Sequence, residues 1–260
     1  MIKFFRHIRQ KLIERNHVGK YMMYAVGEVL LVVIGILIAL SINNWNDQRK
    51  INIQEQVLLK RLDKEFKANK NQLANKIDIR NSIIQNCTKL LKDYNKPENA
   101  DLEQTIIHLS SILPTTYDPI QNDLVSSGTV EIIRNEALKQ MLVSWSTDVK
   151  QLQEVEQLFF SFYEKSIVPY NIEIGIQRDI SYYFWEQGTA SLLEYQELEN
   201  PTPGKSKISQ LSKEKVFNDP KLEGIIAATL NFNQFNNVEA QTLVKRINEI
   251  LDLLKEEIKK

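Results

Sequence analysis

A single apolar run near the N-terminus constrains this chain more than any other feature. Residues 21–42 read YMMYAVGEVLLVVIGILIALSI, and Glu28 is their only charged side chain. An α-helix crosses a bilayer with about 20 apolar residues, so the run predicts one transmembrane helix with a lipid bilayer around it. Tyr24 and Trp45 lie about 31 Å apart along such a helix, which matches the spacing of the aromatic belts at the two membrane surfaces.

Charge sets the expected direction of this helix. Residues 1–20 hold six Lys or Arg against one acidic residue. The positive-inside rule therefore places the N-terminus in the cytoplasm and residues 43–260 outside it. A cleaved signal peptide would use Ala39–Ser41 as its cleavage site, but the long apolar run and the twenty-residue basic lead favour a retained helix.

Residues 1–20 also form a basic amphipathic segment, since Phe5, Ile8 and Leu12 share one helical stripe and the bases lie off it. Such a helix can rest on the anionic inner leaflet. The alternative interpretation is that these bases only enforce the topology, and the sequence does not choose between the two.

Glu28 invites a functional interpretation because an ionisable group is costly at this depth. Glu28, Gly35 and Ala39 share one helical face, on which the two small residues allow close approach of a second helix. We expect this face to dock another membrane helix, from a partner protein or from a second copy in a homodimer. The alternative is that Glu28 extends towards the cytoplasmic headgroups near Lys20.

Scarce turn residues predict an all-α domain after the membrane segment. The chain has only 8 Gly and 7 Pro, fewer than a sheet-rich fold needs. Apolar residues recur at helical spacing in three long stretches, residues 47–94, 135–168 and 219–258. The first can continue directly from the membrane span. We therefore expect a single N-terminal transmembrane helix followed by an elongated antiparallel helical bundle.

Cap and turn residues divide this domain further. Asp118-Pro119 predicts the start of a short helix that Gly128 ends in the left-handed conformation. Pro169 is expected to end the second long helix, and residues 200–204 read as a loop. The predicted N-caps of three other helices are Asp101, Asn135 and Asp219.

The charge and cysteine content exclude some classes of partner and bond. Residues 43–260 carry a small net negative charge, which argues against nucleic acid as a partner. Cys87 is the only cysteine, so no internal disulfide can form. It falls in register with Ile84 and Leu91, and we expect a buried small hydrophobic residue.

A search for chemistry finds no catalytic or metal-binding pattern. The three histidines, His7, His17 and His108, have no Cys or carboxylate partners at metal-ligand spacing. The carboxylates sit at polar helical positions, where we expect solvated surfaces. The sequence therefore predicts no cofactor, no metal and no enzymatic activity; the alternative is a novel enzyme whose site residues converge only in the folded chain.

One aromatic block within residues 175–198 is a candidate pocket wall. Core packing is the usual role of aromatic residues at helical spacing, and a ligand pocket is the alternative. The residues of the block are Tyr182, Tyr183, Phe184 and Trp185.

The opening of the chain resembles a known family. IKFFRHIRQKL, followed by KYMMYAVGEVLLVVIGILIALSINNWND, is similar to the start of a membrane-anchored family of Bacteroidota, the domain of unknown function 6090. A weaker similarity follows in residues 124–138 and in the C-terminal helix. The resemblance implies a bacterial inner-membrane protein with its domain in the periplasm, and it supplies no activity, cofactor or catalytic residue.

Two functional hypotheses follow. The first is a non-enzymatic interaction or scaffold module of the bacterial envelope, anchored by residues 21–42. The second is a periplasmic ligand-sensing bundle that signals through a membrane partner. The short cytoplasmic segment, with no room for an output domain, argues against the second.

Overall fold

The computed structural model describes residues 18–120, 128–187, 199–209 and 211–258. All regular structure in these ranges is helical, which confirms the all-α class. Contacts divide the chain into two compact units, an N-terminal unit of residues 1–58 and a helical unit of residues 59–260.

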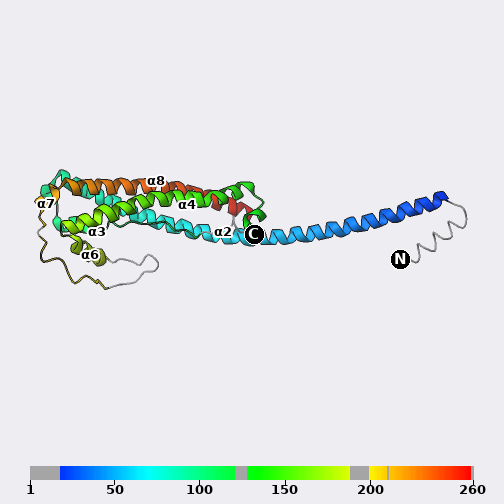
Figure 1. Ribbon diagram of the computed structural model, residues 1–260, viewed down its shortest axis with the longest axis horizontal. Helices are drawn as coiled ribbons and strands as arrows, with labels where there is room; N and C mark the ends of the chain where they lie inside the picture. Colours follow the sequence, from blue (N-terminus) through cyan, green and yellow to red (C-terminus); the bar gives the residue numbers. More distant parts are fainter. Residues whose placement is uncertain (1–17, 121–127, 188–198, 210, 259–260) are drawn as a thin grey trace. The chain divides into compact units, whose positions relative to one another are not determined.

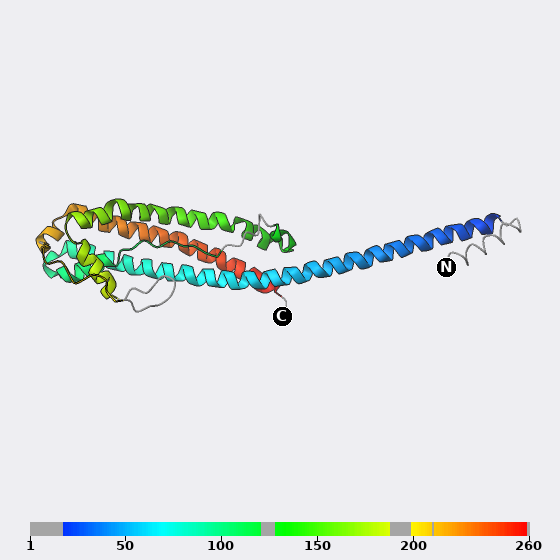
Figure 2. The same ribbon diagram turned by 60° about the horizontal axis from the view of Figure 1, so that its bottom comes forward.

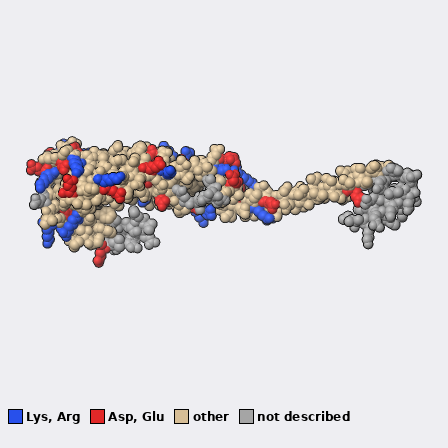
Figure 3. All heavy atoms as spheres, viewed as in Figure 1, with Lys and Arg blue, Asp and Glu red and all other residues tan. Residues whose placement is uncertain are grey.

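The helix α2 (Val18–Asn95) begins in the N-terminal unit and carries the apolar run. Within α2, an 18-residue window has a mean hydropathy of 2.7 with none of it buried, so length and composition suit a membrane span. The core helix of a soluble protein would be mostly buried, whereas a signal sequence near an N-terminus has the same properties. Figure 3 shows that charged side chains gather over the helical unit and are sparse along this exposed helix.

The predicted continuity of the span with residues 47–94 is confirmed, since both belong to α2. After α2 ends at Asn95, before Pro97, the helical unit continues with shorter and longer helices. Their bounds are η1 (Pro97–Asn99), α3 (Leu102–Ser110), η2 (Thr129–Ile132), α4 (Glu136–Phe162), the π-helical turn η3 (Tyr163–Ile167), α5 (Val168–Glu173), α6 (Gln177–Glu186), α7 (Lys213–Phe217) and α8 (Pro220–Glu257).

Capping residues explain where the helices begin. The carboxylate of Asp101 accepts from the backbone N–H of Gln104, and the amide oxygen of Asn135 accepts from that of Leu138. Asp219 caps α8 with Pro220 in its first turn. Each cap satisfies a backbone donor that has no partner within its own helix, and all three predicted caps are confirmed.

Within the helical unit, α4 and α8 lie side by side (Figures 1 and 2). Their contacts pair early residues of one helix with late residues of the other, as in Asn135 with Glu257 and Gln151 with Glu239. The two helices therefore run antiparallel. Contacts of α2 with α4 instead advance together, from Phe66 with Trp145 to Arg80 with Glu156, so these two run parallel.

A hydrophobic core fills the end of the helical unit where α3, α5, α6 and α7 meet the long helices. Cys87 is fully buried there, which confirms its predicted role, and burial raises the pKa of its thiol to about 12. The core cluster at this end includes Ile83, Cys87, Leu90, Leu109, Phe159, Ile167, Tyr170, Ile176, Phe217, Leu222 and Ile226.

Two predicted features of the backbone are wrong. Residues 118–120 are not helical, and the rest of the helix expected there, residues 121–127, lies outside the described residues. Gly128 does adopt a left-handed conformation, with φ 67°, but it precedes η2. Pro169 does not end the chain's helical course, because the wider turn η3 lies directly before it and α5 continues to Glu173.

Polar side chains in the core also contradict an expectation. Glu156 is buried on α4 and pairs with the buried Arg80 of α2, so not every carboxylate lies on a solvated face. The middle of α8 buries Asn233, Asn236 and Asn237, whose amides fall on the same periodic stripe as its apolar residues.

The segment between α3 and α4 begins without regular structure. Residues 112–120, named the strap here, lie against α2 and α4 through side-chain contacts from both helices. No helix, strand or turn occurs in the strap. A connection of this kind cannot satisfy its own backbone groups, so its neighbours must supply partners.

Candidate functional site

Two adjoining hollows flank Tyr170 at one end of the helical unit, and together they are named the Tyr170 cleft. One has a volume of about 390 Å³ and the other about 340 Å³. Both are lined by Tyr170 and Glu173. The first also has Ile174, Leu211, Lys215, Val216 and Asp219, and the second has Phe162, Lys165, Ser166, Pro169, Lys221, Gly224, Ile225 and Ala228.

The cleft lies where the helical course changes between α4 and α5. In a regular α-helix the ring of Pro169 would clash with the carbonyl group of Lys165, four residues earlier. The π-helical turn η3, residues 163–167, lies at this point and widens the backbone. Such single-turn widenings often accompany functional sites, because they redirect the side chains that follow.

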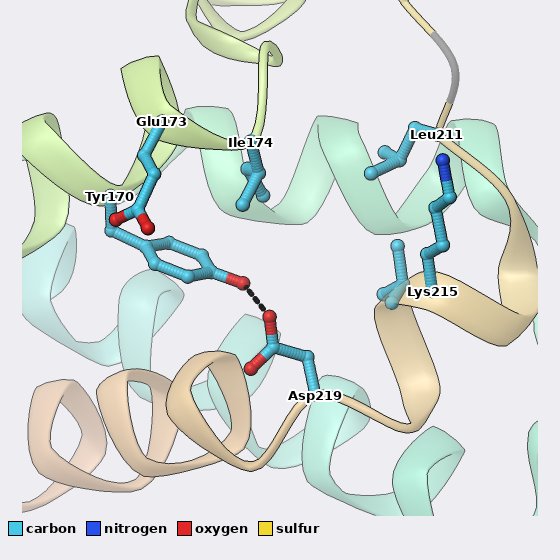
Figure 4. A pocket seen from close by; sticks show the side chains of 7 residues that line it. Tyr170, Glu173, Ile174, Leu211, Lys215 and Asp219 are labelled. Carbon is cyan, nitrogen blue, oxygen red and sulfur yellow. Dashed lines mark hydrogen bonds between the residues drawn. The ribbon is translucent and has the colours of Figure 1, made fainter.

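A hydrogen bond joins the two walls of the cleft. The hydroxyl of Tyr170, on α5, donates to Oδ2 of Asp219, as Figure 4 shows. Oδ1 of the same carboxylate accepts from the backbone N–H groups of Lys221, at 2.8 Å, and Leu222, at 3.3 Å. The N-cap of α8 is therefore also a wall of the cleft.

The environment keeps this pair in fixed protonation states. Burial raises the pKa of the Tyr170 hydroxyl, and its bond to Asp219 raises it further. Burial alone would raise the pKa of Asp219, but the hydrogen bond from Tyr170 and those from the backbone outweigh it and lower the pKa. At neutral pH the site thus presents a protonated phenol and an ionised carboxylate, neither of them near its titration point.

The rim of the cleft carries opposite charges. Lys221 forms an ion pair with Glu173 at 2.8 Å, and its Nζ lies 5.0 Å from the centroid of the Tyr170 ring. Behind the cleft, the hydroxyl of Tyr94 donates to the carbonyl oxygen of Val216 at 2.8 Å. Because the ion pair is largely exposed, it contributes little to stability and remains accessible to a charged ligand.

This arrangement is suited to binding rather than to proton transfer. Apolar side chains, an aromatic ring, one ammonium group and two carboxylates surround a volume of small-molecule size. No group of three or more His, Cys, Asp or Glu side chains able to hold a metal ion occurs in the described ranges.

The residues predicted to dock a second membrane helix all lie in the N-terminal unit, on α2. Glu28 is partly exposed, and Gly35 and Ala39 are exposed. A Cβ atom added to Gly35 would meet nothing within 4 Å, so its face is open to a neighbour. Docking by these residues stays a prediction.

The predicted aromatic block, Tyr182 to Trp185, lies on α6. Tyr183 is buried against the core, and Tyr182 packs at its edge. The hydroxyl of Tyr183 donates to the carboxylate of Glu103, which also pairs with Lys205 at 3.0 Å. The two hollows of the Tyr170 cleft are lined by other residues, and a ligand pocket at this block stays a prediction.

Sequence reasoning identified Asp219 as a cap but missed its role in the cleft, and it missed Tyr170 altogether. The available signal was Pro169 inside an otherwise helical pattern, which marks an irregular turn but does not say which distant residues it faces.

Comparison with known proteins gives one result. Residues 28–139 match DUF6090, a family of unknown function. The match confirms the predicted similarity to that family, and it covers the later part of the apolar run, the rest of α2, α3, the strap and the first residues of α4. The Tyr170 cleft lies outside it. No curated protein and no solved structure matches the chain.

Proposed function

We propose that this chain is a single-pass membrane protein of the bacterial inner membrane, with its helical unit acting as a non-enzymatic interaction or scaffold module of the envelope. The N-terminus is cytoplasmic and residues 43–260 are periplasmic in this proposal. The observation that carries it is the apolar window of α2, which no described part of the chain buries and which is continuous with the rest of that helix.

The sequence predicts an elongated antiparallel bundle; the proposal includes a bundle in which α8 runs antiparallel to α2 and α4, while α2 and α4 run parallel. The antiparallel contacts of α4 with α8 support it, as do the long continuous helices. Long helices with exposed polar surfaces offer extended faces to which other proteins can bind. The charged side chains on these faces argue against a second membrane-spanning segment in the helical unit.

Membrane extraction tests the anchoring. We expect the full-length protein to remain in the membrane pellet after alkaline carbonate treatment, and a Leu37→Arg/Ile38→Arg variant to be released. Each arginine near the centre of the span costs about 2.5 to 3.5 kcal/mol on insertion scales. A matched Lys60→Arg/Lys64→Arg variant, which changes only the helical unit, should stay in the pellet. Release of the unsubstituted protein would refute the proposal.

Cysteine labelling tests the orientation. In a Cys87→Ala background, a membrane-impermeant maleimide should label Lys96→Cys in intact, outer-membrane-permeabilised cells. Lys96 is exposed, at the end of α2. Lys11→Cys should be labelled only after the inner membrane is opened, and the reverse pattern would show the opposite topology.

The alternative function, ligand sensing, is favoured by one observation, the Tyr170 cleft with its ligand-sized hollows. Gly224 lines one hollow, and a Cβ atom there would meet nothing within 4 Å. We therefore expect Gly224→Leu to fill that hollow without disturbing α8. If native mass spectrometry of the full-length protein shows a retained small molecule that this variant loses, sensing replaces scaffolding as the better proposal.

A further inference from the structure

Residues 115–120 of the strap form an extended chain, as two observations indicate. Arg80 of α2 contacts Thr115 and Asn69 contacts Ile120, so five strap residues pass along eleven residues of α2. Eleven helical residues rise about 16.5 Å, and five strap residues match that length at about 3.3 Å each, the rise of a β-strand. Burial along the strap also alternates, with Thr115, Tyr117 and Pro119 buried and the residues between them exposed.

The groove that holds the strap contacts mainly its backbone. The amide of Asn69 both donates to the carbonyl oxygen of Ile120, at 2.9 Å, and accepts from its N–H, at 2.8 Å. Gln72 donates to the carbonyl oxygen of Asp118 at 3.0 Å. From α4, Gln153 donates to the carbonyl oxygen of Tyr117, at 2.9 Å, and Glu156 accepts from its N–H, at 2.8 Å.

These contacts resemble the addition of a strand to a sheet edge, with helix side chains in place of the sheet. Every residue except proline offers the same backbone donor and acceptor. An extended peptide of different sequence can therefore make the same bonds. The sequence specificity of binding therefore depends on the side chains that face the groove. Tyr117 matters most among them, because its side chain is fully buried.

The groove is polar, which suits exchange of its occupant better than permanent packing. Arg80 and Glu156 form its floor, and Arg80 Nη1 and Gln72 Oε1 have no hydrogen-bond partner among the described residues. Apolar residues of similar volume often replace a buried ion pair at no cost in stability, so stability alone does not explain this pair. When an occupant leaves, however, water can solvate these charged and amide groups, whereas an apolar groove would collapse.

We propose that the groove between α2 and α4 binds an extended peptide segment of a partner protein, and that residues 112–120 occupy this site when no partner is bound. This inference rests on the proposed interaction function and names the class of partner. The recognised segment has a tyrosine or another aromatic residue, alternate residues that face the groove, and a residue other than proline three positions after the aromatic one.

A binding assay on the full-length protein in mild detergent tests this proposal. The probe is a fluorescein-labelled peptide with the strap's sequence, ILPTTYDPI, followed by fluorescence anisotropy. The Tyr117→Ala variant weakens the resident strap, so it should bind the probe at least about tenfold more tightly than the unsubstituted protein, in which the strap competes. A probe with alanine in place of its tyrosine should not bind.

Asparagine variants provide the matched control. In the Tyr117→Ala background, Asn69→Ala removes two hydrogen bonds to the peptide backbone and should weaken probe binding about tenfold or more. Asn71→Ala, which changes an exposed residue of the same helix, should leave the affinity unchanged. Equal affinities of the two asparagine variants would overturn the proposed groove.

Hydrogen exchange on the unsubstituted protein tests the same proposal without any variant, so it holds even if a variant fails to fold. The amides of Tyr117 and Ile120 should exchange at least about 100-fold faster than that of Ile247 in the core of α8, because the strap opens without global unfolding. Equal protection would show a permanent strap and overturn the proposal.

A second copy of the chain is the competing occupant. A dimer of the unsubstituted protein that Asn69→Ala dissociates would show strap exchange between copies and would refute a foreign peptide. Probe binding does not depend on membrane insertion. Failure of the probe to bind, with the protein still in the membrane pellet, therefore refutes this inference alone, while release from the membrane refutes the proposed function alone.

Discussion

The buried pair of Arg80 and Glu156 gives the sharpest test of the structure. Both side chains are at most 1% exposed. Removing only Arg80, in Arg80→Met, leaves a buried carboxylate with the Tyr117 N–H as its remaining hydrogen bond and the partly buried Lys76 as its nearby cation, and breaking a buried ion pair in this way costs about 3 to 5 kcal/mol. Glu156→Leu leaves the guanidinium unpaired and also orphans that N–H, which adds about 1 to 3 kcal/mol.

The double variant Arg80→Met/Glu156→Leu should cost less than either single change. It removes both charges and leaves only the Tyr117 N–H and the Thr115 hydroxyl without their partners. We therefore expect a loss of about 1 to 3 kcal/mol, and a coupling energy between the two sites of several kcal/mol. Urea unfolding of the full-length protein in mild detergent, followed by far-ultraviolet circular dichroism, measures all four stabilities.

The pH dependence separates a charge effect from a packing effect. Burial raises the pKa of Glu156, against the lowering effect of Arg80. Without Arg80 that pKa rises further, and a carboxyl whose folded-state pKa is raised favours folding as the pH falls. Arg80→Met should recover stability between pH 7 and pH 5, while the cavity-forming Leu152→Ala, at a buried apolar site, should show no such recovery. If Arg80→Met costs less than about 1 kcal/mol, or shows no recovery, the buried pair as described is wrong.

Three other predictions follow from the caps and the core. Tyr170→Phe should lower the free energy of unfolding by about 1 to 2 kcal/mol at pH 7, because it removes the hydrogen bond to Asp219. The pKa of Asp219 is lowered in the folded protein, so the stabilisation from its ionised form is lost as the pH falls through that pKa. The thermal melting curves of variant and parent should therefore converge in acid. Asn135→Ala should cost about 1 kcal/mol in urea unfolding, with Asn95→Ala, at an exposed helix end, as the neutral control. Cys87 should resist maleimide in the native protein and react fully in urea, because its thiol is buried with a raised pKa; rapid native labelling would contradict the core.

The periodic parts of the fold could be predicted from the sequence alone. The stripe of α8 from Leu222 to Leu254 is buried as expected, and its start at Asp219 follows from cap chemistry. These features depend on residues close together in sequence, where spacing and residue type carry the physical information.

The parts that depend on distant contacts could not be predicted. Val155 fits the apolar stripe of α4, yet its neighbour Glu156 is the buried residue, because Arg80 and the strap backbone offer partners that the local pattern does not show. The strap itself reads as a cap followed by a helix, since Asp118-Pro119 has the right residue types. Its extended form follows from side chains of Asn69 and Gln153, which lie on two other helices.

Several buried polar groups of the three long helices lie at one level, where each finds a partner on another helix. Arg80 on α2 pairs with Glu156 on α4, and the next residue of α2, Asn81, accepts a hydrogen bond from Asn237 on α8 at 2.9 Å. Sliding α4 or α8 by one heptad would leave these groups buried without partners, at several kcal/mol for the ion pair alone. Two helices can pack their apolar stripes almost equally well when one helix is shifted along the other. The buried polar groups of this layer find their partners in only one of these alignments. The layer therefore fixes the alignment of α2 with α4, which in turn holds the donors and acceptors of both helices at the spacing that an extended chain requires.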